Sequence, residues 1–355
     1  MDFSLSDDQD QLLRAADRWI DRSWDGDDVT SVDVRQVRWA ELQANGWTGL
    51  LTPTTSAPMP VLDATLLVER LARGGCTLPV AAGAMVAPLV VAAAGLEPAS
   101  GIDQLLVVDG DDLATSTGRG LELADRVVVL AATATTTVDA SSAAVGDGDG
   151  GRCWSVAIVD VGPGSTLVVQ DEGPTVLSRL TTPADRVALQ PIDRGSGELA
   201  WLVGAVLSAA ELVGLAQAVL DDCVDYAKAR VQGGKPIGGH QAIQHRLADM
   251  LGHIERARYQ TYLAATTITD EAAAGFDPDR PLPAAHRAKA LAGRDCLTAI
   301  RSGHQVMGAI AYSAEHGLHH RHKQAVVAAA EFGDAEHHWA ALEHGHRVAD
   351  PSDRR

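Results

Sequence analysis

Aromatic and basic residues are both scarce in this 355-residue chain. Phe, Trp and Tyr make up 4% of it, and 29 Lys and Arg stand against 47 Asp and Glu, a formal net charge of −18. This charge argues against a general nucleic-acid binder, and the shortage of aromatic rings argues against a protein that stacks single-stranded bases. Hydrophobic residues make up 46% of the chain. That share is ordinary for a soluble protein with large buried cores.

Cysteine is also rare, and no segment has the composition of a leader peptide. The four cysteines are far apart and form no CxxC pair, so they suggest neither a zinc ribbon nor a disulfide framework: Cys76, Cys153, Cys223 and Cys296. The N-terminal segment MDFSLSDDQDQ is acidic and leads into no apolar run. Prolines and small residues in Leu78–Leu96 favour a buried helix over a membrane span. We therefore expect a cytoplasmic protein without membrane insertion.

Hydrophobic periodicity divides the chain into three parts. Residues 1–100 have helical spacing, with a helix end at Asn45-Gly46 and a loop over Thr52–Pro60. Residues 101–195 read as a small β domain with short apolar runs at Leu105–Val108, Arg126–Leu130, Trp154–Val161, Thr166–Gln170 and Arg186–Leu189. The Asp-Gly pairs within Gly146–Gly151 predict a hairpin connection.

Residues 196–348 are predicted to form a helical bundle. One apolar stripe begins at Trp201, a second helix runs through Met250 and Tyr262, and two more helices are expected over Ala284–Met307 and Tyr312–His346. The fold class predicted is therefore α+β and multidomain: an N-terminal helical domain, a small middle β domain and a C-terminal four-helix bundle.

The segment Tyr226–Met250 carries the most informative motif, RVQGGKPIGGHQAIQ from Arg230 onward. It resembles the signature of the acyl-CoA dehydrogenases. In that family this loop joins two helices of the C-terminal bundle and reaches the FAD of the neighbouring subunit. The resemblance implies that the flavin is contacted by Arg230, Gln232, Ile237, His240 and Gln241. Gly233 stands where the family usually has Phe.

A second segment, GHQVMGAIAYSAEH from Gly303 to His316, is similar to the family's Gln- and Gly-rich contact with the ADP part of a flavin. The resemblance assigns this contact to Gln305, Met307 and Gly308. Ala309 and Ala311 replace glycines. The N-terminal opening, Gly46-Trp47 and the run Glu69–Arg73 are also similar to the family, so the resemblance covers nearly the whole chain.

The carboxylate that removes the substrate α proton in this family is not found at either of its usual positions. An ungapped alignment puts Phe332 at one of them, beside Glu331, and Gly204 at the other, in an apolar stretch. A one-residue slip would make Glu331 the base. Glu211 is nearby but reads as the polar side of an amphipathic helix. Small residues such as Gly204 would leave room for a bulky polycyclic acyl group.

The loop with which the family holds its own flavin, of the type Thr-Glu-Pro-x-x-Gly-Ser-Asp, is absent between Leu96 and Asp193. The resemblance then implies a degenerate subunit that completes the FAD site of a catalytic partner, as in the heterotetrameric acyl-CoA dehydrogenases of actinobacteria that act on steroid side chains. An acyl-CoA substrate and an electron-transfer flavoprotein are further expected partners. Two alternatives stay open: a self-sufficient homo-oligomer that uses Glu331 or Glu211, and a flavin-free scaffold.

Histidine is concentrated near the C-terminus. The pairs His316/His320 and His319/His322 have the helical spacing of metal ligands, but no fixed carboxylate or thiolate joins them. A solvated or interface-facing polar surface is the preferred interpretation, and a pH-sensitive interface stays open as an alternative because imidazoles titrate near neutral pH.

Overall fold

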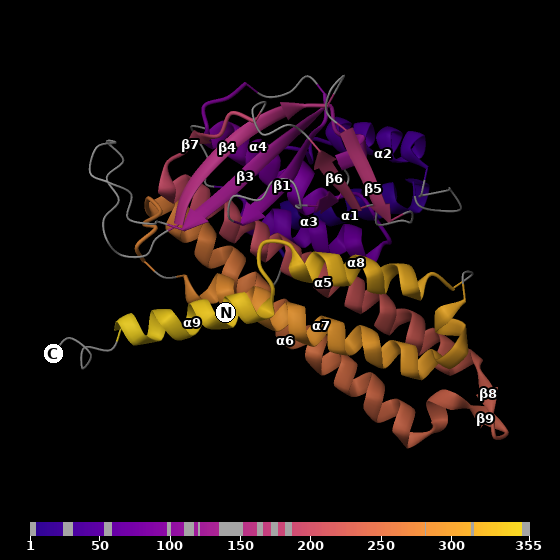
Figure 1. The fold of residues 1–355 in the computed structure, drawn as a ribbon. Coiled ribbons are helices and arrows are strands. Elements are labelled where there is room, and N and C mark those ends of the chain that lie inside the picture. Colours follow the sequence, from indigo (N-terminus) through magenta and orange to yellow (C-terminus); the bar gives the residue numbers. More distant parts are fainter. Residues whose placement is uncertain are drawn as a thin grey trace.

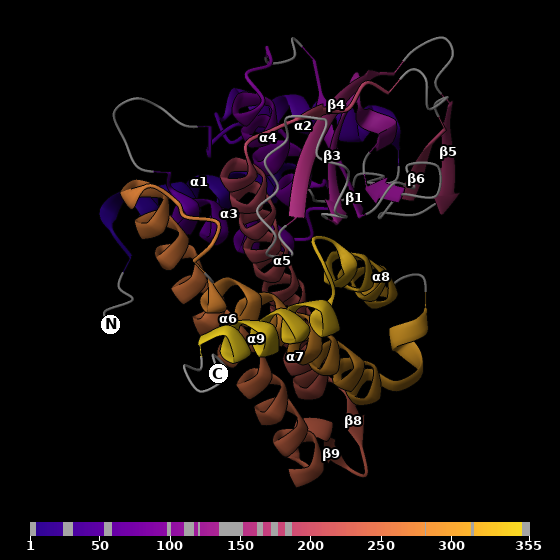
Figure 2. The same cartoon turned by 60° about the vertical axis from the view of Figure 1, so that its left-hand side comes forward.

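The computed structural model describes residues 5–23, 31–52, 59–97, 101–109, 117–119, 121–134, 152–161, 166–171, 177–181, 187–280, 282–313 and 316–349. The N-terminal helices and the β-sheets lie together on one side of a bundle of long helices (Figures 1 and 2). This α+β arrangement is the one that the sequence predicts. The predicted hairpin at Gly146–Gly151 lies outside the described residues.

The N-terminal part contains α1 (Asp7–Ser23), α2 (Val32–Ala44) and α3 (Val61–Arg73). Asn45 and Gly46, which has φ of 72°, follow α2 as predicted. The apolar stretch after α3 forms a π-helical segment, η1 (Val80–Val86), continued by α4 (Ala87–Ala93). Every residue of η1 is buried, so this stretch is a core helix of the protein.

Two small sheets follow. The first has the strand order β1-β3-β4-β7, from β1 (Asp103–Asp109), β3 (Arg126–Ala134), β4 (Arg152–Asp160) and β7 (Gln190–Pro191). Its β1–β3 pair is parallel and the others are antiparallel. The second has the order β2-β6-β5, from β2 (Thr117–Arg119), β6 (Leu177–Thr181) and β5 (Thr166–Asp171). A helical turn, η2 (Leu121–Leu123), follows β2. Within the strand expected over Arg186–Leu189, the described residues 187–189 form no strand, and the two-residue β7 follows them. The short strands β2 and β6 were not predicted from the sequence.

The bundle is built around α5 (Arg194–Ala229), which packs against α3, α6 (Gln241–Ala274), α7 (Pro283–Met307) and α8 (Leu318–Ala330). Asp193 caps its first turn by accepting a hydrogen bond from the Ser196 amide at 2.9 Å. By length and composition α5 could cross a membrane, but 94% of its most apolar window is buried inside the protein. Its hydropathy is that of a buried core helix.

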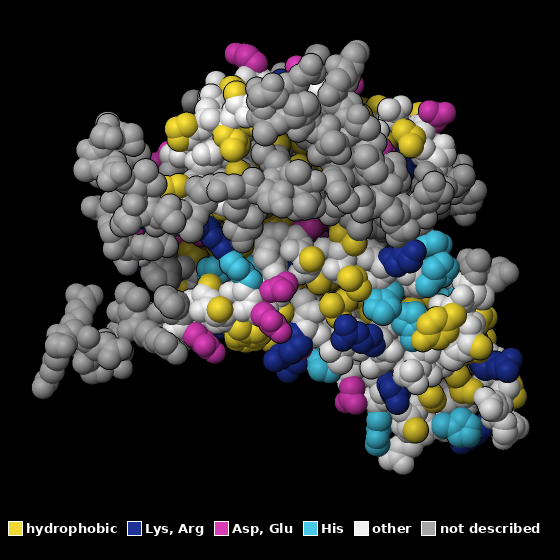
Figure 3. Space-filling view, in the orientation of Figure 1, with side chains coloured by type: hydrophobic (Ala, Val, Ile, Leu, Met, Phe, Trp, Pro, Cys, Tyr) yellow, Lys and Arg dark blue, Asp and Glu magenta, His cyan; other side chains and the backbone are white. Residues whose placement is uncertain are grey.

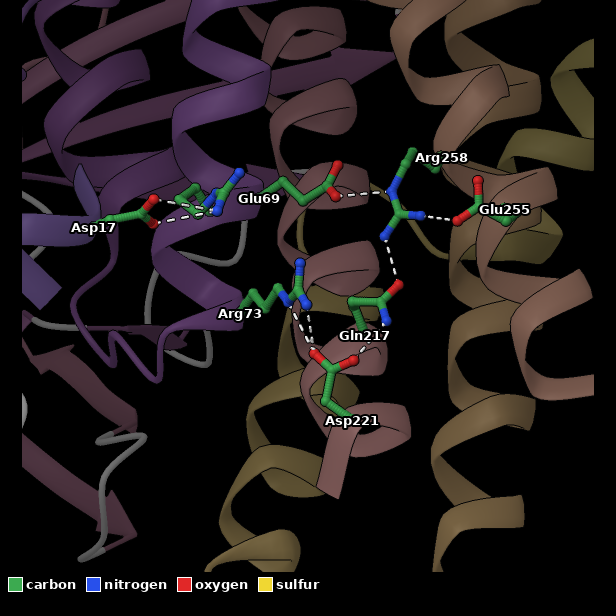
Figure 4. A network of polar contacts seen from close by, with 8 residues as sticks. Asp17, Glu69, Arg73, Gln217, Asp221, Glu255 and Arg258 are labelled. Atoms are coloured by element: carbon green, nitrogen blue, oxygen red, sulfur yellow. Dashed lines mark hydrogen bonds and ion pairs between the residues drawn. The ribbon is translucent and has the colours of Figure 1, made fainter. Parts of the chain in front are cut away.

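A polar network ties α3 to the bundle (Figure 4). Arg258 of α6 donates from Nε to Glu69 Oε1 of α3 and from Nη2 to Gln217 Oε1 of α5, both at 2.8 Å. Arg73 Nε donates to Asp221 Oδ2 of α5 at 2.9 Å. Part of the Glu69–Arg73 run that resembles the family therefore fixes the N-terminal helices to the bundle.

The C-terminal region is broken where one helix was expected. After α7 come a 3₁₀ segment, η5 (Gly308–Tyr312), then α8, and then α9 (Ala335–Ala349) at an angle to α8 (Figure 2). The break lies at Glu331–Asp334, where Phe332 has φ of 55° and Gly333 has φ of 89°. A positive φ at two successive residues cannot continue a right-handed helix, so the predicted helix Tyr312–His346 was wrong.

Candidate functional site

The loop between α5 and α6 is a short hairpin at the end of the bundle far from the sheets (Figures 1 and 2). It consists of β8 (Val231–Gln232), β9 (Lys235–Pro236) and the turn η4 (Ile237–Gly239). Gly233 and Gly234 connect the strands with φ of 64° and 80°, which is the conformation that two-residue hairpins require. The amide of Ile237 donates to the Arg230 carbonyl at 2.8 Å and closes the loop.

A groove of about 730 Å³ lies between this hairpin and the end of α7. The structure brings seven of the predicted cofactor residues to its walls: Arg230, Gln232, Ile237, His240, Gln305, Met307 and Gly308. Gln241, the eighth, is the first residue of α6, does not line the groove, and has its side-chain amide 3.3 Å from His245 Nε2. The two motifs, about 70 residues apart in the sequence, thus form one surface.

The groove also has walls that the sequence analysis did not assign to the cofactor. These are Tyr226, Gly233, Ile243, Val306, Ala309 and Ile310. Ile310 is 40% exposed, so an apolar side chain borders the groove at its solvent side. Tyr226, three residues before the end of α5, was within the quoted motif, whereas an exposed isoleucine leaves no signal in the sequence.

The groove has the chemistry to bind an anionic group. Arg230 is exposed and lines the groove, and in the described part of the chain its guanidinium has no ion pair, so its side-chain donors are free to bind a ligand. Gly308 has φ of 65°, and a Cβ built on it would meet nothing within 4 Å. A ligand can therefore approach the backbone at Gly308 while an arginine fork binds its phosphates or carboxylates.

A buried ion-pair cluster lies beside the middle of α5, where the bundle meets the β-sheets. Arg119, at the end of β2, donates to both carboxylate oxygens of Glu211 at 2.6 and 2.7 Å, and to both of Glu331 at 2.8 and 2.6 Å. Glu211 is 4% exposed, so its interpretation as the polar side of an amphipathic helix was wrong. Both carboxylates considered as bases are held by one guanidinium.

Lys289 of α7 and Gln324 of α8 complete the cluster. Lys289 Nζ, fully buried, donates to Ser208 Oγ at 2.9 Å and to the Ala328 carbonyl. Gln324 Nε2 donates to Glu211 Oε1 at 2.9 Å and to the Cys76 carbonyl at 3.1 Å. The cluster therefore joins β2, α5, α7, α8 and the turn after α3 through buried polar contacts, which are strong when every member has a partner.

Burial and charge act in opposite directions on these groups. Burial alone would raise the pKa of Glu211, but the charge and hydrogen bonds of Arg119 outweigh it, so its pKa lies below the usual range. Burial lowers the pKa of Lys289 to about 7, and the nearby carboxylates of Glu331 and Glu211 only partly oppose that shift. Glu211 is thus a poor proton acceptor near neutral pH.

Phe332 and Gly204 are the two positions at which the family resemblance puts a base, and they pack against each other. A Cβ built on Gly204 would lie 2.2 Å from Phe332 Cε1, and Phe332 is 3% exposed. The phenyl ring occupies the space beside Gly204. The expectation that Gly204 leaves room for a bulky acyl group was therefore wrong.

The groove and the cluster are far apart within the chain. They share no lining residue, and Glu211 and Arg230 are separated by 19 positions of continuous helix, which is about 28 Å. A carboxylate of the cluster could not act on a ligand atom bound beside Arg230 of the same chain.

Histidine side chains gather with Lys and Arg over α8 and η5 (Figure 3). His304 Nε2 lies 3.1 Å from His322 Nδ1, and the His319 and His320 rings are 3.8 Å apart. Burial lowers the pKa of His304, His320 and His322. Among the described residues no group of three His, Cys, Asp or Glu could hold a metal ion, so the pairs His316/His320 and His319/His322 each lack the third ligand that a site needs.

Comparisons with known proteins agree on one family. Residues 201–345 match the acyl-CoA dehydrogenase C-terminal domain. Over 122 residues the chain is 38% identical to acyl-CoA dehydrogenase IpdE2 of Mycobacterium tuberculosis, which covers 34% of each protein. Over 113 residues it is 35% identical to the short-chain-specific acyl-CoA dehydrogenase of Megasphaera elsdenii, or 32% of this chain and 28% of the relative. The matched segments thus span about a third of the lengths of these relatives.

Solved structures extend the likeness in fold to the whole chain. Butyryl-CoA dehydrogenase from Megasphaera elsdenii superposes with a TM-score of 0.72 at 21% identity, covering 98% of this chain and 100% of the other. The Tcur3481-Tcur3483 steroid ACAD superposes with a TM-score of 0.71 at 18% identity, covering 97% and 99%. At these identities the agreement establishes the fold.

Proposed function

Because this chain is related to the acyl-CoA dehydrogenases through its C-terminal domain and has their fold throughout, we propose that it is a non-catalytic subunit of such an enzyme. It completes the FAD site of a catalytic partner and supplies no base of its own. The observation that carries this proposal is the contact between Phe332 and Gly204, which fills with packed apolar atoms the two places where a base would stand.

The other carboxylates near that place are not available as replacements. Arg119 binds Glu211 and Glu331 at 2.6 to 2.8 Å. To take up a proton, Glu211 would have to give up two charge-assisted hydrogen bonds in a buried setting. This favours the proposal of a non-catalytic subunit over the alternative of a self-sufficient enzyme that uses Glu211 or Glu331.

The groove at the α5–α6 hairpin fits the outer part of an FAD molecule. Arg230 would bind the pyrophosphate, Gln232 and Gln305 would hydrogen-bond to polar atoms of the cofactor, and Gly308 would let the nucleotide lie against the backbone. When bound, the flavin accepts the hydride from the substrate β carbon. The remaining part of the cofactor, the acyl-CoA and the base would belong to the partner subunit.

The names of the relatives suggest the substrate class. One structural relative is a steroid ACAD, and we propose that the complex dehydrogenates a steroid-derived or other lipid acyl-CoA in the cytoplasm. An electron transferring flavoprotein is among the chains of similar fold. A flavoprotein of that type would accept the electrons, as the family resemblance also implies.

The test is to identify the subunit whose carboxylate supports turnover. The chain is co-expressed with an acyl-CoA dehydrogenase from the same genome that has both the base and the flavin-binding loop of the family. Reduction of the flavin by acyl-CoA is then followed in the purified complex. Replacing the partner's base should abolish reduction, while Glu331→Gln in this chain should leave the rate within about threefold. Loss of reduction with a folded E331Q complex would instead support the self-sufficient enzyme. Absence of flavin both from the chain alone and from its complex with the partner would support the alternative of a flavin-free scaffold.

A further inference from the structure

A second cavity lies between the first β-sheet and the corner where α8 meets α9. Its volume is about 460 Å³, within the range of pockets that take small organic ligands. Its walls are mainly apolar and include Ala82, Leu105, Val107, Ala132, Val327 and Phe332. An apolar wall of this kind favours an apolar ligand body.

Two arginines line this cavity, Arg119 and Arg152, and their partners differ. Arg119 is saturated by the two carboxylates described above. Arg152, at the start of β4, has its Cζ 4.4 Å from the centre of the Trp201 ring and 5.8 Å from that of Trp154. In the described ranges it has no carboxylate partner.

The polar contact that Arg152 makes within the described ranges leaves its charge uncompensated. Its Nη2 lies 2.6 Å from His337 Nε2, and because a guanidinium has only donors, the imidazole nitrogen must accept. The His337 nitrogen that faces Arg152 therefore acts as an acceptor and carries no proton. Among the described residues, Arg152 is a half-buried cation that is fixed by two indole rings and a histidine, with further N–H groups and no carboxylate partner.

We propose that this cavity binds an apolar carboxylic acid, whose carboxylate pairs with Arg152 and whose hydrocarbon part lies along the β1 and α8 walls. The planar guanidinium matches the geometry of a carboxylate. A bound carboxylate would also supply the negative charge that the half-buried Arg152 lacks among the described residues. The site is at the opposite end of the bundle from the hairpin groove, so it does not depend on the subunit's contribution to a partner's flavin.

The test is calorimetric titration of the purified chain with decanoate, decanol and decanoyl-CoA. Decanoate should bind at least tenfold more tightly than decanol, because only decanoate can pair with Arg152. Decanoate should also raise the melting temperature with concentration. Equal affinities for decanoate and decanol, or no binding of decanoate at millimolar concentration, would overturn the proposal. Tighter binding of decanoyl-CoA would assign the cavity to a thioester instead.

Two variants and a control identify the site. Arg152→Gln should weaken decanoate at least tenfold and leave decanol unchanged. Arg294→Gln is the matched control, because Arg294 also lies over a tryptophan, Trp339 at 5.8 Å, but is paired with Asp295 at 3.0 Å; it should bind decanoate like the wild type. Val107→Phe should weaken both probes by filling the cavity. Unchanged decanoate binding in folded R152Q and V107F proteins would place the ligand elsewhere.

Discussion

The ring of Phe332 lies directly over the Cα of Gly204, with only 2.2 Å between its Cε1 and the place where a Cβ at 204 would be. Phe332 keeps this position through a backbone φ of 55°, in the region that non-glycine residues rarely adopt. Packing holds it there, since the ring is 3% exposed. The two substitutions relative to the family therefore depend on each other: a phenyl ring fits at 332 because residue 204 has no side chain.

This dependence predicts a strongly non-additive pair of variants. Gly204→Ala should cost about 1–3 kcal/mol of unfolding free energy, because its Cβ overpacks against the ring. Phe332→Ala should cost about 3–5 kcal/mol through the cavity it leaves. In the double variant the Gly204→Ala cost should vanish or change sign, since alanine favours the helix. Urea denaturation of all four proteins measures the coupling, and additive costs would contradict the contact.

Arg119 should be among the most sensitive positions in the chain. Arg119→Met leaves Glu211 and Glu331 without their counter-charge and should lower the unfolding free energy by about 3–5 kcal/mol. Arg194→Met is a suitable control, since the Arg194–Asp279 pair has side chains 43% and 73% exposed and should contribute less than about 1 kcal/mol. Similar losses of unfolding free energy in the two variants would show that the buried ion pairs of Arg119 contribute no more to stability than an exposed pair does.

The lowered pKa of Lys289 should make the free energy of unfolding depend on pH. Its pKa falls from 10.5 to about 7 because the folded protein buries it. Between these two values the unfolded chain binds more protons than the folded one, so stability should rise with pH, by up to about 1.4 kcal/mol per unit. In Lys289→Met this rise should be absent.

The measurement is the difference between the urea-denaturation curves of wild type and K289M from pH 7 to 10. Burial also raises the pKa of the Cys76 and Cys296 thiols, which would lower stability at alkaline pH. Both proteins contain these thiols, so the difference isolates Lys289. Parallel pH profiles for the two proteins would contradict the assigned role.

Arg230 is the residue on which the proposed binding of a partner's flavin depends most. In a complex with the catalytic subunit, Arg230→Gln should weaken FAD retention by about 10- to 100-fold, the range expected for losing hydrogen bonds to a charged group. Arg287→Gln, on an exposed position of α7 without an ion pair in the described structure, is the control. Equilibrium dialysis of FAD against each complex measures the effect, and equal retention by the two variants would remove Arg230 from the site.

The sequence was sufficient for the bundle and for the hairpin groove because their signals are local. The motif from Arg230 to Gln244 sits on one loop and the start of one helix, and glycines mark its turn. The long apolar run of α5 and the apolar residues spaced along α6 and α7 likewise located these helices.

The buried cluster could not be predicted in the same way. Arg119 is 92 residues from Glu211 and 212 from Glu331, and it ends a three-residue strand that carries no periodic signal. Without its partner, Glu211 looks like a surface residue of a helix. The break at Phe332 was missed for a related reason: the tertiary contact with Gly204 and the positive φ of Phe332 and Gly333 distinguish it from a helix interior.

The most direct test of the account is the flavin content of the chain purified alone and after co-expression with its catalytic partner, with subunit stoichiometry measured by native mass spectrometry. The account predicts a colourless chain alone and one FAD per pair of subunits in the mixed complex. A chain that binds a full equivalent of FAD by itself would contradict it and would return the search for a base to Glu331 and Glu211.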